Sequence, residues 1–290
     1  MRWIREGAAF GGRAAGEPDG LRALRPWVLQ EAGGRLRMWY SGHDGTTGRI
    51  LAAARRPDGA WERLGVAIDA GSAGDSDQYG VESPCVVRTP GSYLMAYGGF
   101  DGEATRLHMA TSDDGRGWTA QGTIMQRGPD EALGASHPCL LSTEAGWWLF
   151  FCGYDGSRDS RRAAILAAVS PTGASWDRVG VVLAPVTGEL AVSHPCVIQV
   201  ARTFYMFYAS DDGGRVSVAM ATSANGCSWD RHGTVLAATG QGAEAGGVHS
   251  PCVVRLQDGS LHMWYAALAG DDASLAYQIH SARFPGPWSV

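Results

Sequence analysis

The sequence has no long run of apolar residues. Nowhere among its 290 residues does an uninterrupted apolar stretch reach the length of about 18 that a membrane-spanning helix needs. The opening segment, MRWIREGAAF, contains no apolar core long enough for a secretory signal. We therefore expect a cytoplasmic protein with no membrane partner.

Charged residues are also scarce, at 18% of the chain, and the formal net charge is -5. No run of Lys or Arg stands out, although proteins that bind nucleic acid usually carry a basic patch or stripe. These absences argue against a nucleic-acid partner. A small-molecule substrate is the partner that we expect.

Long segments with a helical period of 3.6 residues are missing as well, and glycine is abundant at 41 residues. Glycine weakens the interior of a helix, and a helix on a protein surface needs a periodic apolar face. Together these features leave little room for helices. The sequence predicts an all-β fold.

What the sequence does contain is a repeat marked by proline. Five segments align on Pro26, Pro84, Pro138, Pro195 and Pro251, with spacings of 58, 54, 57 and 56 residues. They read LRPWVL, ESPCVV, SHPCLL, SHPCVI and HSPCVV. A period this constant is typical of an architecture built from stacked or radial repeats.

Each period contains the pattern of four strands. After the proline segment comes an aromatic run that ends in a turn, such as LRMWYSGHDG or YLMAYGGFDG, which is typical of a strand entering a hairpin. A third strand such as RLHMATS follows, and a tryptophan then opens a fourth, as in WERLGVAI. Four strands per repeat form one propeller blade. We predict that residues 1–290 form a single domain, a five-bladed β-propeller with four-stranded blades.

The two ends of the chain predict how the ring closes. The last period contains three strands and stops at Trp288, whereas the segment from Trp3 to Phe10 matches the pattern of the fourth strands. The N-terminal strand is therefore expected to complete the last blade. Such closure leaves no free sheet edge open to aggregation.

Four of the six cysteines occupy equivalent positions, one residue after a repeat proline. They are Cys85, Cys139, Cys196 and Cys252. A small apolar residue at a repeated position indicates packing between blades. A disulfide framework, or a role as a thiolate or metal ligand, is the less favoured interpretation.

The two residues before each proline are the main candidates for chemistry, because the first strand of a propeller blade lines the central channel. The residues directly before proline are Arg25, Ser83, His137, His194 and Ser250, and those one position earlier are Leu24, Glu82, Ser136, Ser193 and His249. Proline biases the residue before it toward an extended conformation, which predicts fixed positions at the channel mouth. Buried backbone groups could account for the polar residues, but one Arg, one Glu and three His at matched sites favour a function. Because side chains alternate along a strand, not all of them can face one centre.

Acidic residues in the loops form a second set of candidates. Asp75, Asp77 and Tyr79 precede the second repeat proline, Asp130 and Glu131 the third, Glu189 the fourth and Glu244 the fifth. The hairpin acids Asp44, Asp101, Asp155 and Asp211 are predicted to form turns, because Asp-Gly suits hairpin geometry. Asp44, which follows an unrepeated His43, is the expected exception. The segment from Thr111 to Trp118, TSDDGRGW, fits the Asp-box pattern, which lies far from propeller active sites.

Taken together, the blade number, the ATSxDGxxW-like turns, the MWYSG-type second strands and the repeated prolines resemble those of the five-bladed propeller glycoside hydrolases. This assemblage includes families 32, 43, 62, 68, 117 and 130, and the resemblance covers the whole chain. It implies that carboxylates on the first strands act as acid and base. Glu82, in VESPC, matches the Glu-x-Pro context of the general acid. Where family 43 commonly has its basic Asp before the first proline, this chain has Arg25.

Glycoside hydrolysis usually needs two carboxyl groups, so the departure at Arg25 requires a substitute. Asp77 or Asp44 from the loops, or a histidine, is expected to supply it. Our main hypothesis is a glycosidase-like hydrolase that needs no cofactor and acts on a small intracellular glycoside or glycosylated metabolite in the central channel. The catalytic candidates are Glu82 as acid, His137 or His194 as base or as the residue that orients it, and Asp77. The substrate-binding candidates are Arg25, Asp44, His249 and Tyr79. Of these, Arg25 would bind a carboxylate, phosphate or hydroxyl group, and the Tyr79 ring would stack on a sugar.

Two alternatives remain open at this point. The first is a metal-dependent lyase, cyclase or oxygenase in which a divalent ion such as Zn, Fe, Mn, Ni or Ca is bound by His137, His194, His249 and Glu82. The second is a non-catalytic propeller that binds a ligand or protein on its upper face. This last hypothesis predicts that replacement of Glu82 or His194 leaves function intact.

Overall fold

The structure is a computed structural model, and it describes residues 3–11, 16–154, 162–270, 277–285 and 288. Strands make up most of this part of the chain, which confirms the prediction of an all-β fold. The helices in it are short 3₁₀ turns: η1 (Ala32–Gly34), η2 (Pro129–Glu131) and η3 (Gly242–Glu244). No helix in the described residues has the length and apolar character needed to cross a membrane.

The strands pair in antiparallel groups of four that follow the sequence repeat. The first group is β2 (Arg22–Gln30), β3 (Leu36–His43), β4 (Gly48–Arg55) and β5 (Trp61–Ile68). The second is β6 (Val81–Thr89), β7 (Ser92–Phe100), β8 (Thr105–Ser112) and β9 (Thr119–Thr123). The third is β10 (Gly134–Thr143), β11 (Gly146–Tyr154), β12 (Ala164–Ser170) and β13 (Asp177–Leu183). The fourth is β14 (Ala191–Val200), β15 (Thr203–Asp211), β16 (Val216–Ser223) and β17 (Asp230–Leu236).

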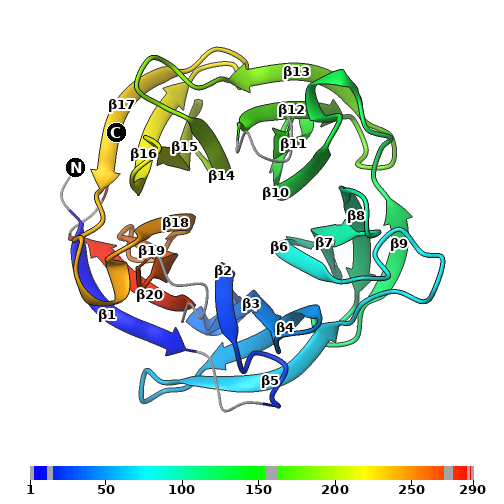
Figure 1. Cartoon of the computed structure of the whole chain (residues 1–290), viewed down its shortest axis with the longest axis horizontal. Helices are drawn as coiled ribbons and strands as arrows, with labels where there is room; N and C mark the ends of the chain where they lie inside the picture. Colours follow the sequence, from blue (N-terminus) through cyan, green and yellow to red (C-terminus); the bar gives the residue numbers. More distant parts are fainter. Residues whose placement is uncertain (1–2, 12–15, 155–161, 271–276, 286–287, 289–290) are drawn as a thin grey trace.

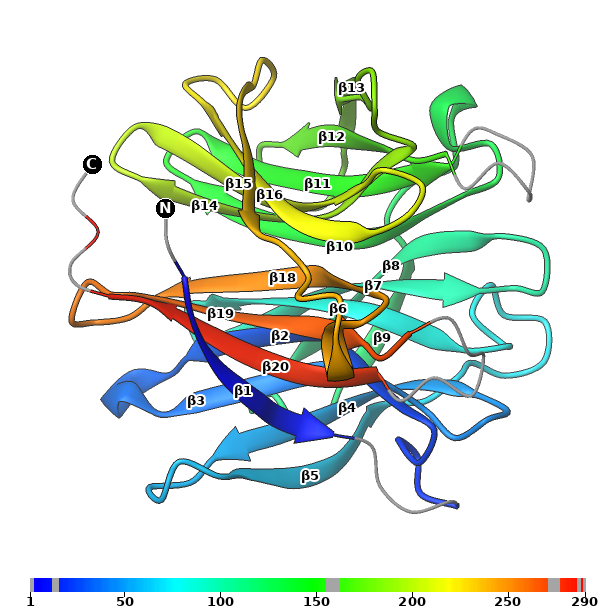
Figure 2. The same ribbon diagram turned by 60° about the vertical axis from the view of Figure 1, so that its left-hand side comes forward.

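The last group joins the two ends of the chain. It consists of β18 (Gly247–Arg255), β19 (Leu261–Leu268), β20 (Tyr277–Phe284) and the N-terminal strand β1 (Ile4–Gly11). β1 pairs antiparallel with β20, from Ile4 opposite Arg283 to Gly11 opposite Gln278. Figure 2 shows β1 lying alongside β20. The N-terminal strand therefore occupies the place that its sequence pattern predicted.

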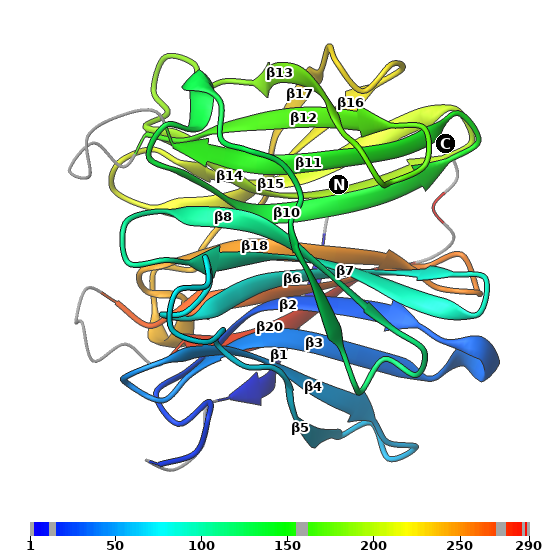
Figure 3. The ribbon, with the colours of Figure 1, turned by 90° about the vertical axis from the view of Figure 1, so that its right-hand side faces the viewer.

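The first strand of every group lies innermost. Figure 1 shows β2, β6, β10, β14 and β18 around the centre of the molecule, and each of them contacts the next around the ring. From the side, the β6–β8 sheet lies between the β10–β12 sheet and the β2–β5 sheet (Figure 3). Residues from all five repeats therefore meet at one axis.

The residues before the repeat prolines do not have the extended conformation that we expected. Their φ angles are positive, between 52° and 56°, at Arg25, Ser83, His137, His194 and Ser250. At each site the strand pairing shifts register, as between Glu82 and Cys85. This β-bulge, which places two residues opposite one, overrides the preference of the pre-proline residue. A left-handed non-glycine residue costs of order 1–3 kcal/mol and is typical of functional sites.

The repeated cysteines connect neighbouring groups, as the packing interpretation predicted. They are buried and unpaired. Each sulfur accepts a hydrogen bond from a backbone N–H of the next innermost strand; the Leu140 N–H, for example, lies 3.0 Å from Cys85 Sγ, and the Val28 N–H lies 3.1 Å from Cys252 Sγ. In the first repeat Trp27 takes the cysteine position, and its indole N–H donates to the Val86 carbonyl at 2.7 Å.

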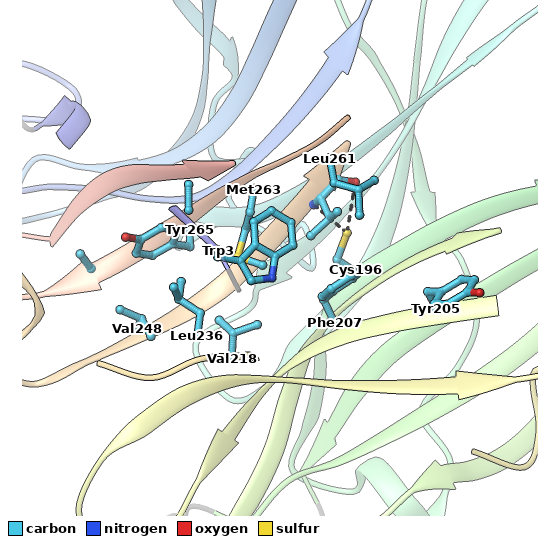
Figure 4. Packing of buried hydrophobic residues seen from close by; sticks show 13 residues of the cluster. Trp3, Cys196, Tyr205, Phe207, Val218, Leu236, Val248, Leu261, Met263 and Tyr265 are labelled. Atoms are coloured by element: carbon cyan, nitrogen blue, oxygen red, sulfur yellow. Dashed lines mark hydrogen bonds between the residues drawn. The ribbon is translucent and has the colours of Figure 1, made fainter. Parts of the chain in front are cut away.

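Apolar side chains fill the space between neighbouring sheets. Figure 4 shows one such cluster, in which Trp3 packs near Phe207, Leu236 and Tyr265. The rings of Trp3 and Phe207 meet edge to face with 6.1 Å between their centroids. Full burial of one such side chain contributes about 1.5–3 kcal/mol. Trp27 packs against the clusters on every side of the axis, so it is a central packing residue as well as a hydrogen-bond donor.

Candidate active site

A small cavity of about 30 Å³ lies on the axis and is lined from all the repeats. Its walls are Arg25, Pro26, Trp27, Ser83, Pro84, His137, Pro138, His194, Pro195, Ser250 and Pro251. The lining thus takes every residue that directly precedes a repeat proline and none from the position before it. This is the alternation that the sequence predicted, and the bulge is what turns the pre-proline side chains toward the axis.

Arg25 and Glu82 form an ion pair at the edge of this pocket. Their side chains are 22% and 32% exposed, so solvent and small molecules can reach both. Burial by itself would lower the pKa of Arg25, but the charge and hydrogen bond of Glu82, together with the nearby Tyr154 and Tyr277, raise that pKa above its ordinary value. Among the described residues, Glu82 is the one carboxylate that hydrogen-bonds to a side chain lining the pocket.

Three histidines lie in a row beside this pair. The ring centroids of His137 and His194 are 3.7 Å apart, and those of His194 and His249 are 5.0 Å apart. A neighbouring serine contacts Nδ1 of each ring: Ser136 at 2.5 Å from His137, Ser193 at 2.8 Å from His194, and Ser250 at 2.7 Å from His249. Because these serines occupy Nδ1, the reactive nitrogen left on each ring is Nε2.

Burial keeps these imidazoles neutral near pH 7. It holds the pKa of His137 and that of His194 well below the usual range, and nearby basic groups add to the effect. Burial, followed by the charge of Arg25, lowers the pKa of His249 to about 3. A neutral imidazole is suited to accept a proton or to donate a hydrogen bond, and it is poorly suited to act as a cationic acid.

Asp77 does not line the pocket. Its carboxylate accepts a hydrogen bond from the Tyr97 hydroxyl at 3.1 Å and lies 3.8 Å from Nδ1 of His108. Within the described residues, no hydrogen bond or ion pair connects it with Glu82. Asp77 therefore has structural contacts outside the pocket lining, and its catalytic role beside Glu82 stays a prediction.

The position of Asp77 belongs to a repeated anchor of the loops. In the other repeats the equivalent acid pairs with an arginine two residues after the tryptophan of the fourth strand. These pairs are Asp19 with Arg63, Glu131 with Arg178, Glu189 with Arg231 and Glu244 with Arg5. In the second repeat the arginine position is Ala120, and His108 is the basic neighbour instead. The loop acids thus have structural partners.

Asp44, the expected exception among the hairpin acids, makes the contacts of a turn former. It accepts hydrogen bonds from the backbone N–H groups of Thr46 at 2.7 Å and Thr47 at 2.9 Å, and it pairs with Arg49. These hydrogen bonds lower its pKa. Asp101 makes the same set of contacts in the second repeat. A substrate-binding role for Asp44 therefore has no support in its contacts, and Asp155 lies outside the described residues.

Tyr79 has an exposed ring, and its role in stacking on a sugar stays a prediction. Its side chain is 60% exposed, and its ring centroid lies 6.4 Å from that of Phe100, which is 39% exposed. The Tyr79 N–H donates to the Phe100 carbonyl at 3.0 Å, so the backbone fixes the two rings side by side. Both lie on the edge of the molecule where β6 begins and β7 ends, close in sequence to Glu82.

Three polar residues near the pocket, Arg22, Tyr154 and Tyr277, were not among the candidates from the sequence. The Tyr154 hydroxyl lies 3.1 Å from Ser136 Oγ, and the Tyr277 ring lies 5.6 Å from the His249 ring. For Arg22 a signal existed. Four residues before the repeat proline, the other repeats have small residues, namely Gly80, Gly134, Ala191 and Gly247.

The metal alternative finds no ligand set in the described part of the chain. There, no group of three or more His, Cys, Asp or Glu side chains is arranged to hold a metal ion. The three histidine rings are tilted by 47° and 40° to one another along the row, and a serine contacts each of them at Nδ1. A metal at this site stays a prediction that elemental analysis can test.

Solved structures with the same fold define the class of this architecture. A structure described as a glycoside hydrolase superposes with a TM-score of 0.79 at 16% identity, covering 99% of this chain and 94% of that protein. Beta-1,2-mannobiose phosphorylase from Listeria innocua gives 0.78 at 12% identity, covering 98% and 97%. A thermostable family-43 glycoside hydrolase gives 0.71 at 13% identity, covering 97% and 100%. The chain has the fold of the glycoside hydrolase-like β-propellers.

The proteins related in sequence match a smaller part of the chain than the solved structures do. No protein-family model matches the chain. It is 30% identical over 171 residues to Uncharacterized protein MT1551 of Mycobacterium tuberculosis (strain CDC 1551 / Oshkosh), an alignment that covers 53% of this chain and 54% of that protein. Uncharacterized protein Rv1502 of Mycobacterium tuberculosis (strain ATCC 25618 / H37Rv) matches with the same identity and coverage. The chain spans about half the length of these curated relatives.

Proposed function

We propose that this chain is a glycoside-cleaving enzyme that acts at the mouth of the axial pocket. The observation that carries the proposal is the position of Glu82, a partly exposed carboxylate beside a pocket lined by neutral histidines. The proposal includes a five-bladed ring closed by β1, which the pairing of β1 with β20 supports. It also includes a small intracellular substrate, no nucleic-acid or membrane partner, and no cofactor.

In this mechanism Glu82 gives its proton to the departing glycosidic oxygen. Water attacks the anomeric carbon as the carbon–oxygen bond breaks, and His194 accepts the proton of that water at Nε2. His194 is favoured over His137 because it is half-buried on the pocket wall, whereas His137 is buried. One carboxyl group and one imidazole thereby replace the usual pair of carboxyl groups.

Aryl glycosides that differ in leaving group test these roles. Glu82→Gln should lose about 10²–10⁴-fold in kcat/KM on phenyl or alkyl glycosides. On 2,4-dinitrophenyl glycosides the loss should be much smaller, because that leaving group needs no proton. His194→Gln should reduce cleavage of both kinds.

Glu62→Gln, a change at an exposed position on β5, is the matched control and should leave the rates unchanged. Equal losses of Glu82→Gln on both kinds of glycoside would remove Glu82 from the acid role. Wild-type protein that cleaves no glycoside in a broad panel would contradict the proposed function. Metal analysis of wild type and a His137→Ala, His194→Ala double variant tests the metal alternative with the same preparations.

A further inference from the structure

The first repeat contributes a cationic wall to the axial site. Arg25 takes the position directly before its proline, and Arg22 takes the position four before it, where the other repeats have Gly or Ala. A wall of two arginines replaces the carboxylate that the resemblance led us to expect there. The substitution changes the charge of this side of the pocket from negative to positive.

Arg22 is not part of the pocket lining, and its connection to the histidine row is through Tyr277. Its guanidinium carbon is 5.5 Å from the centroid of the Tyr277 ring, which in turn contacts the His249 ring. Its Nε is buried and has no hydrogen-bond partner among the described residues. No acid is paired with Arg22 in the described part of the chain, so its charge is available to a ligand.

The pocket itself contains further unpaired polar atoms. Arg25 Nε, His137 Nε2 and Ser83 Oγ are buried and lack a hydrogen-bond partner among the described residues. Ser83 and His137 are only 4% and 6% exposed, and all three residues line the pocket. A buried polar atom without a partner destabilises the pocket as long as no ligand is bound. The pocket therefore contains unpaired polar atoms, among them the Arg25 Nε–H donor, and a ligand rich in acceptor oxygens would give that donor a partner.

We propose that the axial pocket binds an oxyanion, a carboxylate or phosphate group of the substrate, with Arg25 and Arg22 as its cationic partners. Ser83 and the Nε2–H of His137 complete the set of donors. Guanidinium groups suit both anions because their N–H groups match paired oxygen atoms. This inference rests on the proposed function and narrows its substrate class to acidic glycosides, either uronides or phosphorylated sugars.

Anion binding also prepares the acid. An oxyanion that binds Arg25 competes with Glu82 for the guanidinium and releases Glu82 from its ion pair. The released carboxyl group is then able to carry the proton for the leaving group. A neutral glycoside lacks this competition for Arg25, so we expect slower cleavage of it. Recognition of the anion and proton transfer are thereby coupled through one arginine.

Isothermal titration calorimetry on the full chain tests the inference without any catalytic step. The probes are D-glucuronate, D-glucose 6-phosphate, inorganic phosphate and D-glucose, all at one ionic strength. We expect at least one anionic probe to bind about tenfold or more tightly than glucose, because hydrogen bonds to a charged group are stronger than neutral ones. Binding of glucuronate alone identifies a carboxylate site, and binding of the phosphates alone identifies a phosphate site.

Variants decide whether the anion binds where we propose. Arg25→Gln and, separately, Arg22→Gln should each weaken the anion about tenfold or more, and Arg25→Lys should restore part of the affinity. Arg106→Gln is the control, because Arg106 pairs with Asp101 in a hairpin outside the pocket lining. Arg22→Gln leaves the Glu82 ion pair intact, so it remains informative if Arg25→Gln does not fold.

Two results would overturn the inference. One is glucose binding as tightly as the anions, and the other is anion binding that survives both arginine replacements. Each is independent of the proposed function, which fails separately if no glycoside is cleaved or if Glu82→Gln has no effect. Anion binding at this site with no glycoside cleavage would retain the inference about the ligand and discard the enzyme.

Discussion

The indole N–H of Trp27 donates a hydrogen bond to the carbonyl of Val86 at 2.7 Å. It thereby makes, in the first repeat, the link to the next innermost strand that a cysteine thiol makes in the others, as Cys85 does with Leu140. Trp27 also lines the axial pocket. Trp27 therefore has two roles. It completes the series of hydrogen bonds that join the innermost strands of neighbouring repeats, and it forms part of the pocket wall.

Trp27→Phe should lower the free energy of unfolding by about 1–3 kcal/mol, because the buried Val86 carbonyl loses its donor. Urea denaturation followed by far-UV circular dichroism measures the change. Trp118→Phe is the matched control, since Trp118 Nε1 is already buried without a hydrogen-bond partner among the described residues. Equal losses for the two variants would show that the link from Trp27 to Val86 contributes no stability.

Stability should decrease as the pH falls below about 6.5, the usual pKa of histidine in an unfolded chain. In the folded state burial lowers the pKa of His137, His194 and His249, the last to about 3. Between the two values the unfolded chain binds the proton and the folded chain does not, so acid favours unfolding. Each such histidine adds a slope of about 1.4 kcal/mol per pH unit.

Urea denaturation at several pH values between neutral and acid conditions measures that slope. His249→Gln should make it shallower, whereas His232→Gln, at an exposed position, should leave it unchanged. A slope that His249→Gln does not alter would contradict a buried neutral imidazole at this position.

Ser83→Gly should be more stable than Ser83→Ala by about 1 kcal/mol. The φ angle of Ser83 is 56°, a left-handed conformation that glycine adopts without strain and alanine does not. Neither variant loses a hydrogen bond of the hydroxyl, because Ser83 Oγ is buried without a partner in the described part of the chain, and the Ser83 N–H keeps its bond to Ser41. Thermal unfolding of both variants makes the comparison, and alanine equal to glycine would argue against strain.

Ala120→Arg should stabilise the protein by up to about 1 kcal/mol, the usual range of a partly exposed ion pair. Ala120 lies opposite Ala110 in the strand pairing, as Arg63 lies opposite Ala53 in the first repeat. The new arginine is therefore placed to pair with Asp77. In an Asp77→Asn background the gain should vanish, and a gain that persists there would show that it comes from elsewhere.

The Asp77→Asn variant also distinguishes a structural role of Asp77 from a catalytic one. Asp77→Asn should reduce stability through its contact with Tyr97 and leave kcat on an aryl glycoside unchanged. A large loss of kcat in a protein with unaltered thermal unfolding would return Asp77 to the catalytic group.

The repeat, the strand pattern and the position of the N-terminal strand were predictable because they depend on local patterns of apolar and turn residues. The pairing of Ile4 through Gly11 with β20 follows from such a pattern. The conformation before each proline was not predictable in this way. There the local preference favours an extended backbone, and the register shift of the paired strands imposes a left-handed one.

The residues of the candidate site also fall into those that the sequence pattern identified and those whose contacts only the structure showed. Glu82, Arg25 and the three histidines stood out in the sequence because they depart from the repeat. Asp77 and Asp44 also stood out, and their partners Tyr97 and Arg49 give them structural contacts that no local pattern specifies.

The sequence by itself determined the period, the order of the strands and the residue types available at the innermost positions. Only the tertiary structure decided which of these residues meet. Arg25 and Glu82 are separated by 57 positions, yet they form one ion pair because β2 and β6, the first strands of two consecutive repeats, pack against each other. The physical reason is that contacts between the innermost strands depend on how whole sheets pack against one another. The local sequence around each residue does not specify that packing.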